Sequence, residues 1–166
     1  MPKQKREKGF TLIEIIAMMI LIGIVSVVVF SRGTSTNEAN IKTQAEALRG
    51  HIRYVQLRAM NADADTSVIA TCKSSYGISM SPNSYFMFKN CNKNLRVSLP
   101  GAINDVVTLQ NVTLSASSDV TFDMWGRPCS YPLGDTPNAN DIVFTLGGTE
   151  TIKITKNTGF VPSPLN

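Results

Sequence analysis

The feature that most constrains this chain is an apolar run near its N-terminus. Residues 10–30 are 21 positions long, and only Thr11, Glu14, Gly23 and Ser26 interrupt their strongly apolar character. As a helix rising 1.5 Å per residue the run spans about 31 Å, which matches the hydrocarbon core of a bilayer. We therefore expect a membrane-spanning helix over residues 10–30. A charge inside such a helix costs about 2.5–3.5 kcal/mol near the bilayer centre, so Glu14 needs a partner.

Two other readings of this region are an uncleaved signal anchor and a cleaved secretory signal. In an anchor, Glu14 lies within reach of the lipid headgroups. A secretory signal has a weak cleavage site at Val29-Phe30-Ser31. However, the apolar run is longer than the usual ~7–15 residues of such a signal, which disfavours the second reading.

A short basic leader precedes the apolar run. It holds Lys3, Lys5, Arg6 and Lys8 against Glu7, so the formal charge of +4 for the whole chain falls to +1 without it. The basic balance therefore belongs to the leader and does not by itself indicate nucleic-acid binding. Positive charge before an apolar span places the N-terminus in the cytoplasm and the remainder outside, which in a Gram-negative cell is the oxidising periplasm.

The segment Lys8-Gly9-Phe10-Thr11-Leu12-Ile13-Glu14, followed by the apolar helix, resembles the prepilin signature of type IV pilins and type II secretion pseudopilins. The resemblance implies that a prepilin peptidase removes residues 1–9 by cutting between Gly9 and Phe10 and then methylates the new amine of Phe10. It also implies that Glu14 pairs with the N-terminus of a neighbouring subunit. The physics agrees, because pairing satisfies a carboxylate and an ammonium that are both unfavourable alone in an apolar setting.

Residues 31–166 are expected to form a periplasmic domain with room for a real core. Residues 31–37 are weak helix formers, so they form either a continuous but pliable helix or a short joint. Residues 38–61 are predicted to be helical, because one apolar stripe recurs at intervals of four and three residues. Its members are Ile41, Ala45, Leu48, Ile52, Val55 and Ala59.

The rest of the domain shows strand patterns, and residues 127–140, with three prolines and a glycine, are expected to form a loop. A long helix followed by short strands predicts an α+β fold, with the helix packed on an antiparallel β-sheet as in pilins. If residues 77–81 also form a strand, they belong to a meander with the first two strands. The predicted strands cover residues 66–72, 85–88, 95–99, 106–109, 112–114, 120–122, 141–146 and 151–155, the last two joined by a hairpin turn at 147–150.

Three later segments, residues 49–60, 122–128 and 151–161, are similar to the FimT/GspH-like minor pilins, a group that includes minor pilins of mannose-sensitive haemagglutinin-type pili. The resemblance implies a minor pilin or pseudopilin that is assembled into, or primes, a type IV pilus-like filament. Its partners would be other pilin subunits, the prepilin peptidase, the inner-membrane assembly platform and membrane lipid. The alternatives are a subunit at the tip of a type II secretion pseudopilus and a DNA-binding minor pilin of DNA uptake.

No catalytic pattern stands out, and we expect a substrate of an enzyme rather than an enzyme. His51 is the only histidine, which makes a metal site unexpected, and no cofactor motif occurs. Asn61, Asp63 and Asp65 resemble the start of a calcium loop but lack its later glycine and glutamate, so we interpret them as a turn that ends the helix.

A polar row beside the apolar stripe consists of Lys42, Glu46, Arg49, Arg53 and Gln56, and Arg49, Arg53 and Arg58 form a basic row on the same predicted helix. Basic side chains along one helical face can follow the phosphates of a nucleic acid. Glu46 lies in the same row and the mature chain is almost neutral, so we expect a structural role and keep nucleic-acid contact as the alternative.

Three cysteines in an exported domain predict one disulfide and one remaining thiol. We expect Cys72–Cys91, which closes the shortest loop of about 19 residues and stabilises the fold by ~3 kcal/mol in the chain-entropy model. The pairings Cys91–Cys129 and Cys72–Cys129 stay open, because Cys129 lies in the proline-rich loop and can move to meet a partner.

Overall fold

The computed structural model describes residues 11–62, 76–115, 119–131 and 136–163, with the backbone alone at 30–36. The chain divides into two compact units, residues 1–40 and 41–166. The predicted strand at 66–72 lies outside the described residues.

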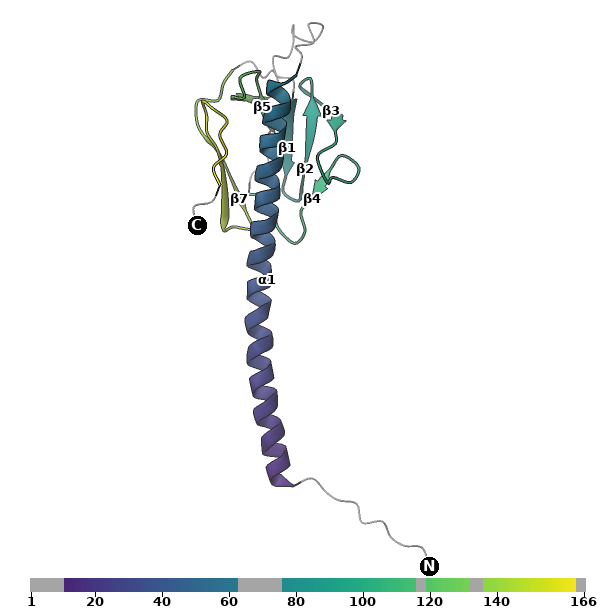
Figure 1. Cartoon of the computed structure of the whole chain (residues 1–166), viewed down its shortest axis with the longest axis vertical. Coiled ribbons are helices and arrows are strands. Elements are labelled where there is room, and N and C mark those ends of the chain that lie inside the picture. The colour runs from purple at the N-terminus through teal and green to yellow at the C-terminus, as the bar shows by residue number, and fades with distance from the viewer. Residues whose placement is uncertain (1–10, 63–75, 116–118, 132–135, 164–166) are drawn as a thin grey trace, which may run out of the picture. The chain divides into compact units, whose positions relative to one another are not determined.

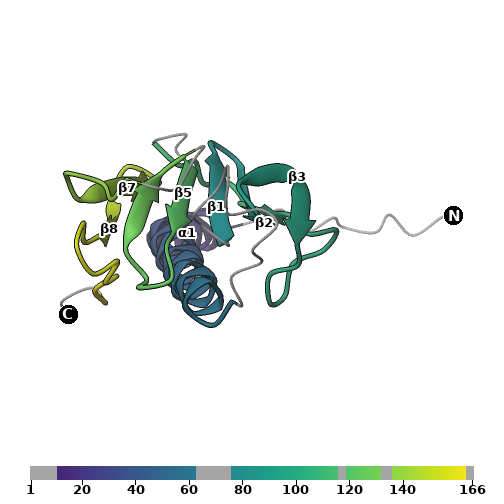
Figure 2. The same cartoon turned by 90° about the horizontal axis from the view of Figure 1, so that it is seen from above.

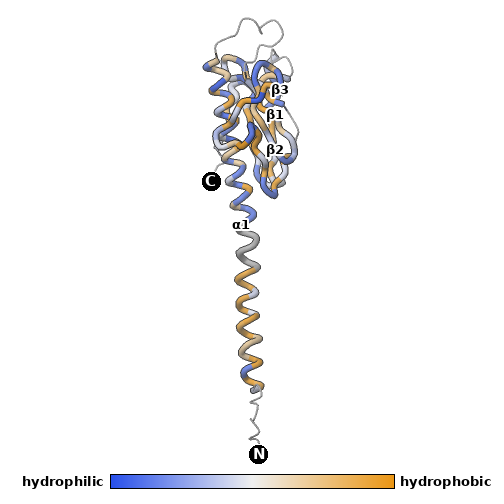
Figure 3. The backbone as a smooth tube through the Cα atoms, turned by 90° about the vertical axis from the view of Figure 1, so that its right-hand side faces the viewer, coloured by the Kyte–Doolittle hydropathy of each residue, from blue (hydrophilic) through white to orange (hydrophobic). Residues whose placement is uncertain are grey.

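A single helix, α1 (Leu12–Met60), contributes to both units. Its residues 12–29 are strongly apolar, and Figure 3 shows this part of the tube as mostly orange, with a blue stretch near its start. The backbone stays helical at residues 31–37. The continuous helix is therefore observed there, and not the short joint that was the other expectation. Such weak helix formers continue a helix when long, strongly helical segments flank them on both sides.

The second unit places the rest of α1 along one side of antiparallel strands, as Figures 1 and 2 show from two directions. One sheet has the strand order β3-β2-β1-β5-β6, with β4 paired to β2, and a separate hairpin joins β7 to β8. This arrangement confirms the predicted α+β class. The strands are β1 (Tyr76–Ser81), β2 (Ser84–Lys89), β3 (Asn92–Val97), β4 (Val107–Thr108), β5 (Asp119–Phe122), β6 (Pro128–Ser130), β7 (Ile142–Leu146) and β8 (Glu150–Ile154).

The apolar stripe of the second half of α1 forms one wall of the core. Ala45, Leu48, Ile52, Val55 and Ala59 are all buried, and Ile41 packs against them at the edge. The opposite wall comes from alternate strand positions, as expected when one face of each strand faces a helix. Its members include Ile78, Met80, Tyr85, Met87, Val120, Phe122, Phe144, Leu146, Ile152 and Ile154.

Two sequence predictions were wrong in detail. Residues 127–140 were expected to be a loop, yet β6 pairs with β5 there in a register that includes Phe122 opposite Pro128. Proline is tolerated because β6 lies at the edge of the sheet and Pro128 is its first residue, where no amide is needed for the ladder. The predicted strand at 112–114 is reduced to one bridge between Leu114 and Leu146.

Candidate functional site

The apolar part of α1 carries the first candidate site. By length and composition, Leu12–Val29 is suited to cross a membrane, with a mean hydropathy of 2.9 and none of the segment buried within the protein. Folding of the chain alone therefore leaves a large apolar surface exposed. A patch of this size indicates a surface that is covered by lipid or by other protein.

The start of α1 is fixed by Thr11, whose carbonyl accepts bonds from the amides of Glu14 at 3.0 Å and Ile15 at 3.4 Å. Thr11 and Glu14 have the spacing of a capping box, and a carboxylate is favoured near the positive end of the helix dipole. Ser26 is satisfied within the helix, because its hydroxyl donates to the carbonyl of Ile22 at 2.7 Å. Between Leu12 and Val29, the only charged side chain is that of Glu14, and it is exposed.

Gly9 and Phe10 lie outside the described residues. Cleavage and methylation at this junction therefore stay predictions that rest on the sequence.

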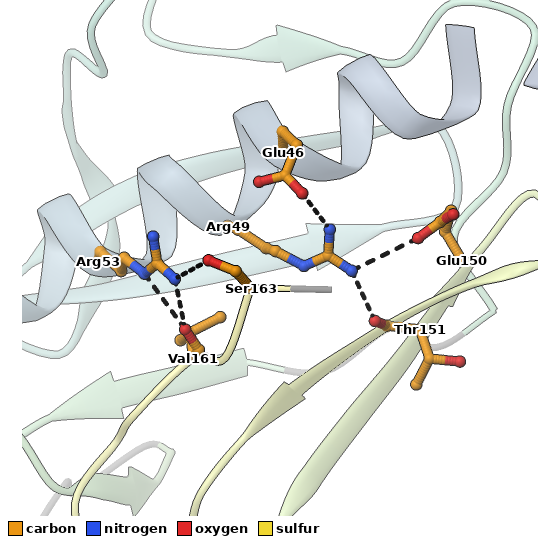
Figure 4. Close-up of polar contacts among 7 residues, drawn as sticks. All are labelled: Glu46, Arg49, Arg53, Glu150, Thr151, Val161 and Ser163. Carbon is orange, nitrogen blue, oxygen red and sulfur yellow. Dashed lines mark hydrogen bonds and ion pairs between the residues drawn. The ribbon is translucent and has the colours of Figure 1, made fainter. Parts of the chain in front are cut away.

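Arg49 lies inside the domain rather than on its surface, with 3% of its side chain exposed. Its Nη1 donates to Glu46 at 2.7 Å, and its Nη2 donates to the carbonyl of Thr151 at 2.8 Å and lies 3.5 Å from the carboxylate of Glu150 (Figure 4). A buried guanidinium is stable only when it is paired and bonded in this way. Arg49 therefore joins α1 to the start of β8.

Arg53, one helical turn later, is exposed and bonds to the C-terminal segment. Its Nη2 donates to the carbonyl of Val161 at 2.6 Å and to the hydroxyl of Ser163 at 3.3 Å (Figure 4). Arg58, further along, lies over the ring of Tyr76 with 5.4 Å between its guanidinium carbon and the ring centre.

Of the three side chains, Arg49 is buried, whereas Arg53 and Arg58 are exposed. Each guanidinium is used to hold a strand, the C-terminal segment or an aromatic ring. A nucleic-acid contact at these positions stays a prediction that only a binding measurement tests.

His51 bridges the helix to two parts of the sheet region. Its Nδ1 lies 2.8 Å from the hydroxyl of Tyr85, and its Nε2 lies 2.9 Å from the carbonyl of Pro100. Burial raises the pKa of Tyr85, and when the neutral imidazole carries its proton on Nε2, the phenol donates to Nδ1. The carbonyl of Pro100 only accepts, so the network assigns the imidazole proton to Nε2.

The cysteine pairing stays a prediction, because Cys72 lies outside the described residues. Cys91 is in the turn between β2 and β3 with a left-handed backbone (φ 50°). Cys129 is buried in β6, and its thiol donates to the carbonyl of Arg127 at 3.5 Å.

Sequence reasoning missed the role of Gln56, which was assigned only to a polar row. Its Nε2 donates to the carbonyls of Gly126 at 2.8 Å and Thr158 at 2.9 Å, so it ties two turns to the end of α1. The available signal was the presence of glycine in both turns, at Gly126 and Gly159, where φ is positive. Among the residues that the structure describes, no group of three or more potential metal ligands comes together.

The match between this chain and a known protein family lies at the N-terminus. Residues 4–30 match the prokaryotic N-terminal methylation motif, which indicates a type IV pilin-like protein of the prepilin type. No curated protein and no solved structure matches the chain.

Proposed function

We propose that this protein is a minor pilin, a structural subunit that is cut between Gly9 and Phe10, methylated on Phe10 and assembled into a type IV pilus-like filament. The observation that carries the proposal is an exposed apolar helix that lies within the methylation motif and holds one carboxylate, Glu14, in its first turn. The partners are other pilin subunits, the prepilin peptidase, the inner-membrane assembly platform and membrane lipid. The protein is anchored in the inner membrane before assembly, with residues 31–166 in the periplasm.

Glu14 supplies the recognition chemistry in this proposal. Cleavage creates an ammonium at Phe10, at the end of an apolar helix, while Glu14 is a carboxylate one turn inside the same helix. A neighbouring subunit brings the two opposite charges together, which offsets the cost of a lone charge among apolar surroundings, a cost that reaches ~2.5–3.5 kcal/mol at the bilayer centre and is smaller one turn from the helix end. Assembly is therefore favoured over the isolated subunit in the membrane.

The test compares Glu14→Ala with Glu38→Ala, a matched removal of an exposed carboxylate beyond the apolar segment of the same helix. Both variants should be processed and reach the membrane at normal levels. We expect Glu14→Ala to be depleted from sheared filaments and Glu38→Ala to be incorporated normally. Normal incorporation of Glu14→Ala would remove the assigned role of the carboxylate, and an unmethylated N-terminus would remove the proposal itself.

A type II secretion pseudopilus uses the same helix chemistry, so a different measurement separates it from a pilus. Recovery of the protein in filaments sheared from the cell surface supports the pilus. A secretion defect on deletion, without surface filaments, supports the pseudopilus. DNA uptake is tested by a mobility-shift titration of the soluble domain over salt, where salt-sensitive binding would favour a DNA-binding minor pilin.

A further inference from the structure

Met60, the last residue of α1, lies against one of the two turns that Gln56 holds. A Cβ placed on Gly126 would be 2.9 Å from Sδ of Met60 and 3.0 Å from Nε2 of Gln56, so the sulfur and the amide nitrogen lie within about 6 Å of each other. This agrees with their spacing, because residues four apart lie on the same face of a helix. The sulfur of Met60 is therefore a neighbour of the group that ties both turns to α1.

The side-chain amide of Gln56 has no spare proton to donate. It carries two protons, and Nε2 donates to the carbonyl of Gly126 at 2.8 Å and to that of Thr158 at 2.9 Å. The thioether sulfur of a methionine is a weak acceptor and does not compete for these protons. A strong acceptor on the Met60 sulfur would compete, and Gln56 could bond to it only by releasing one of the two carbonyls.

Met60 is accessible to small oxidants in the folded protein. It is 49% exposed, close to the 57% of Met124 in the neighbouring turn, whereas Met80 is 2% exposed and Met87 is fully buried. Oxidation converts the apolar side chain of an accessible methionine into a polar sulfoxide. The sulfoxide oxygen is the strong acceptor that the thioether lacks.

Hydrogen peroxide supplies the oxygen for this step. A lone pair of the Met60 sulfur attacks one peroxide oxygen, and the S–O bond forms as the O–O bond breaks. The sulfur loses two electrons, and the peroxide gains them and leaves as water after a proton transfer. Methionine sulfoxide reductases reverse the change, because two thiols reduce the sulfoxide to the thioether and give a disulfide and water.

We propose that Met60 is a peroxide-sensitive modification site, and that its sulfoxide takes one proton of the Gln56 amide away from the turns at 123–127 and 155–160. The end of α1 then holds one of these turns in place of two. A Cβ on Gly159 would lie only 2.2 Å from the carbonyl oxygen of Gly126, so the turns are packed together and release of one disturbs the other.

The first test treats the full-length protein in detergent micelles with hydrogen peroxide and follows each methionine by peptide mass mapping. We expect Met60 and Met124 to be oxidised at similar rates, at least about tenfold faster than Met80 and Met87. Oxidation of Met60 no faster than that of the two buried methionines would overturn the proposal.

The second test measures hydrogen exchange in the two turns before and after oxidation. The amide of Gly126 donates to the carbonyl of Asp123 at 2.9 Å, and the amide of Gly159 donates to that of Thr155 at 2.8 Å, so both amides report on opening of their turns. We expect roughly fivefold faster exchange after oxidation, the change that corresponds to the loss of one ordinary hydrogen bond. Unchanged exchange at complete oxidation of Met60 would overturn the proposal.

Two variants provide matched controls for the exchange measurement. Met60→Leu keeps a side chain of similar volume that peroxide does not oxidise, so exchange in both turns should stay slow after treatment. Met124→Leu removes the other exposed methionine of this region and should respond to peroxide as the wild type does. An equal response of Met60→Leu and the wild type would overturn the proposal, because oxidation elsewhere would then be the cause.

Two further comparisons test the role of Gln56 and the reversibility of the change. Gln56→Ala should show fast exchange in both turns before treatment and no further increase when Met60 is oxidised. Reductases for both sulfoxide epimers should restore slow exchange in the oxidised wild type. A further increase in Gln56→Ala as large as in the wild type would overturn the assigned competition for the amide protons.

Discussion

Replacing Gly159 by alanine should separate the two turns that Gln56 ties together. Gly159 has a positive φ of 63°, and a Cβ there would lie 2.2 Å from the carbonyl oxygen of Gly126 and 2.6 Å from Nε2 of Gln56. The first of these atoms is backbone and cannot rotate away. The turns must move apart by roughly 1 Å to reach an ordinary contact distance.

The expected loss has three parts. A left-handed backbone costs a non-glycine residue about 1 kcal/mol. Separation of the turns leaves Gln56 able to keep one of its two bonds, now 2.8 and 2.9 Å long, which adds about 1 kcal/mol, and the disturbed packing adds about 1 kcal/mol more. We therefore expect Gly159→Ala to lower the free energy of unfolding by about 3 kcal/mol.

Gly148→Ala is the matched control, because Gly148 has a similar φ of 76° but nothing within 4 Å of the added carbon. It should lose only the backbone part, about 1 kcal/mol. The assay is urea unfolding, followed by circular dichroism, of a fragment that begins at Glu38, since every residue of the core cluster lies within 45–161. Equal losses in the two variants would refute the reasoning, because the clash at Gly159 would then have no energetic consequence.

Three further predictions concern stability and processing. Gly50→Ala should stabilise the fragment by about 0.5–1 kcal/mol in the same assay, because Gly50 lies inside a helix with open space around it and glycine is the weaker helix former. Lys153 and the amide of Lys156 lower the pKa of Asp141 in the folded protein. The ionised carboxylate therefore stabilises the fold when the pH is above the pKa of an aspartate in the unfolded chain, ~3.9. Unfolding curves of wild type and Asp141→Asn should therefore converge as the pH falls below about 4, and a constant difference would contradict the assignment. Gly9→Val should block processing and leave a precursor about nine residues heavier by mass spectrometry, whereas an unchanged mature mass would show that the cut lies elsewhere.

Features that depend on neighbours in the chain were predictable from the sequence. The helix of residues 38–61, the apolar stripe that ends at Ala59, and strands such as those at 85–88 and 120–122 were predicted and observed. Period and composition carry this information, because a side chain's face on a helix or strand follows from its position alone. The same local pattern identified the exposed apolar segment and the carboxylate at Glu14.

Features that depend on distant residues required the tertiary structure. Arg49 and Gln56 read as members of a polar row, yet each bonds to a carbonyl far along the chain, at Thr151 and at Gly126. The strand β6 forms despite its proline because β5 offers it an edge. The physical reason is common to all three: a polar group or a short segment takes the partner that folding brings beside it, and local sequence does not encode which carbonyl or strand edge that will be.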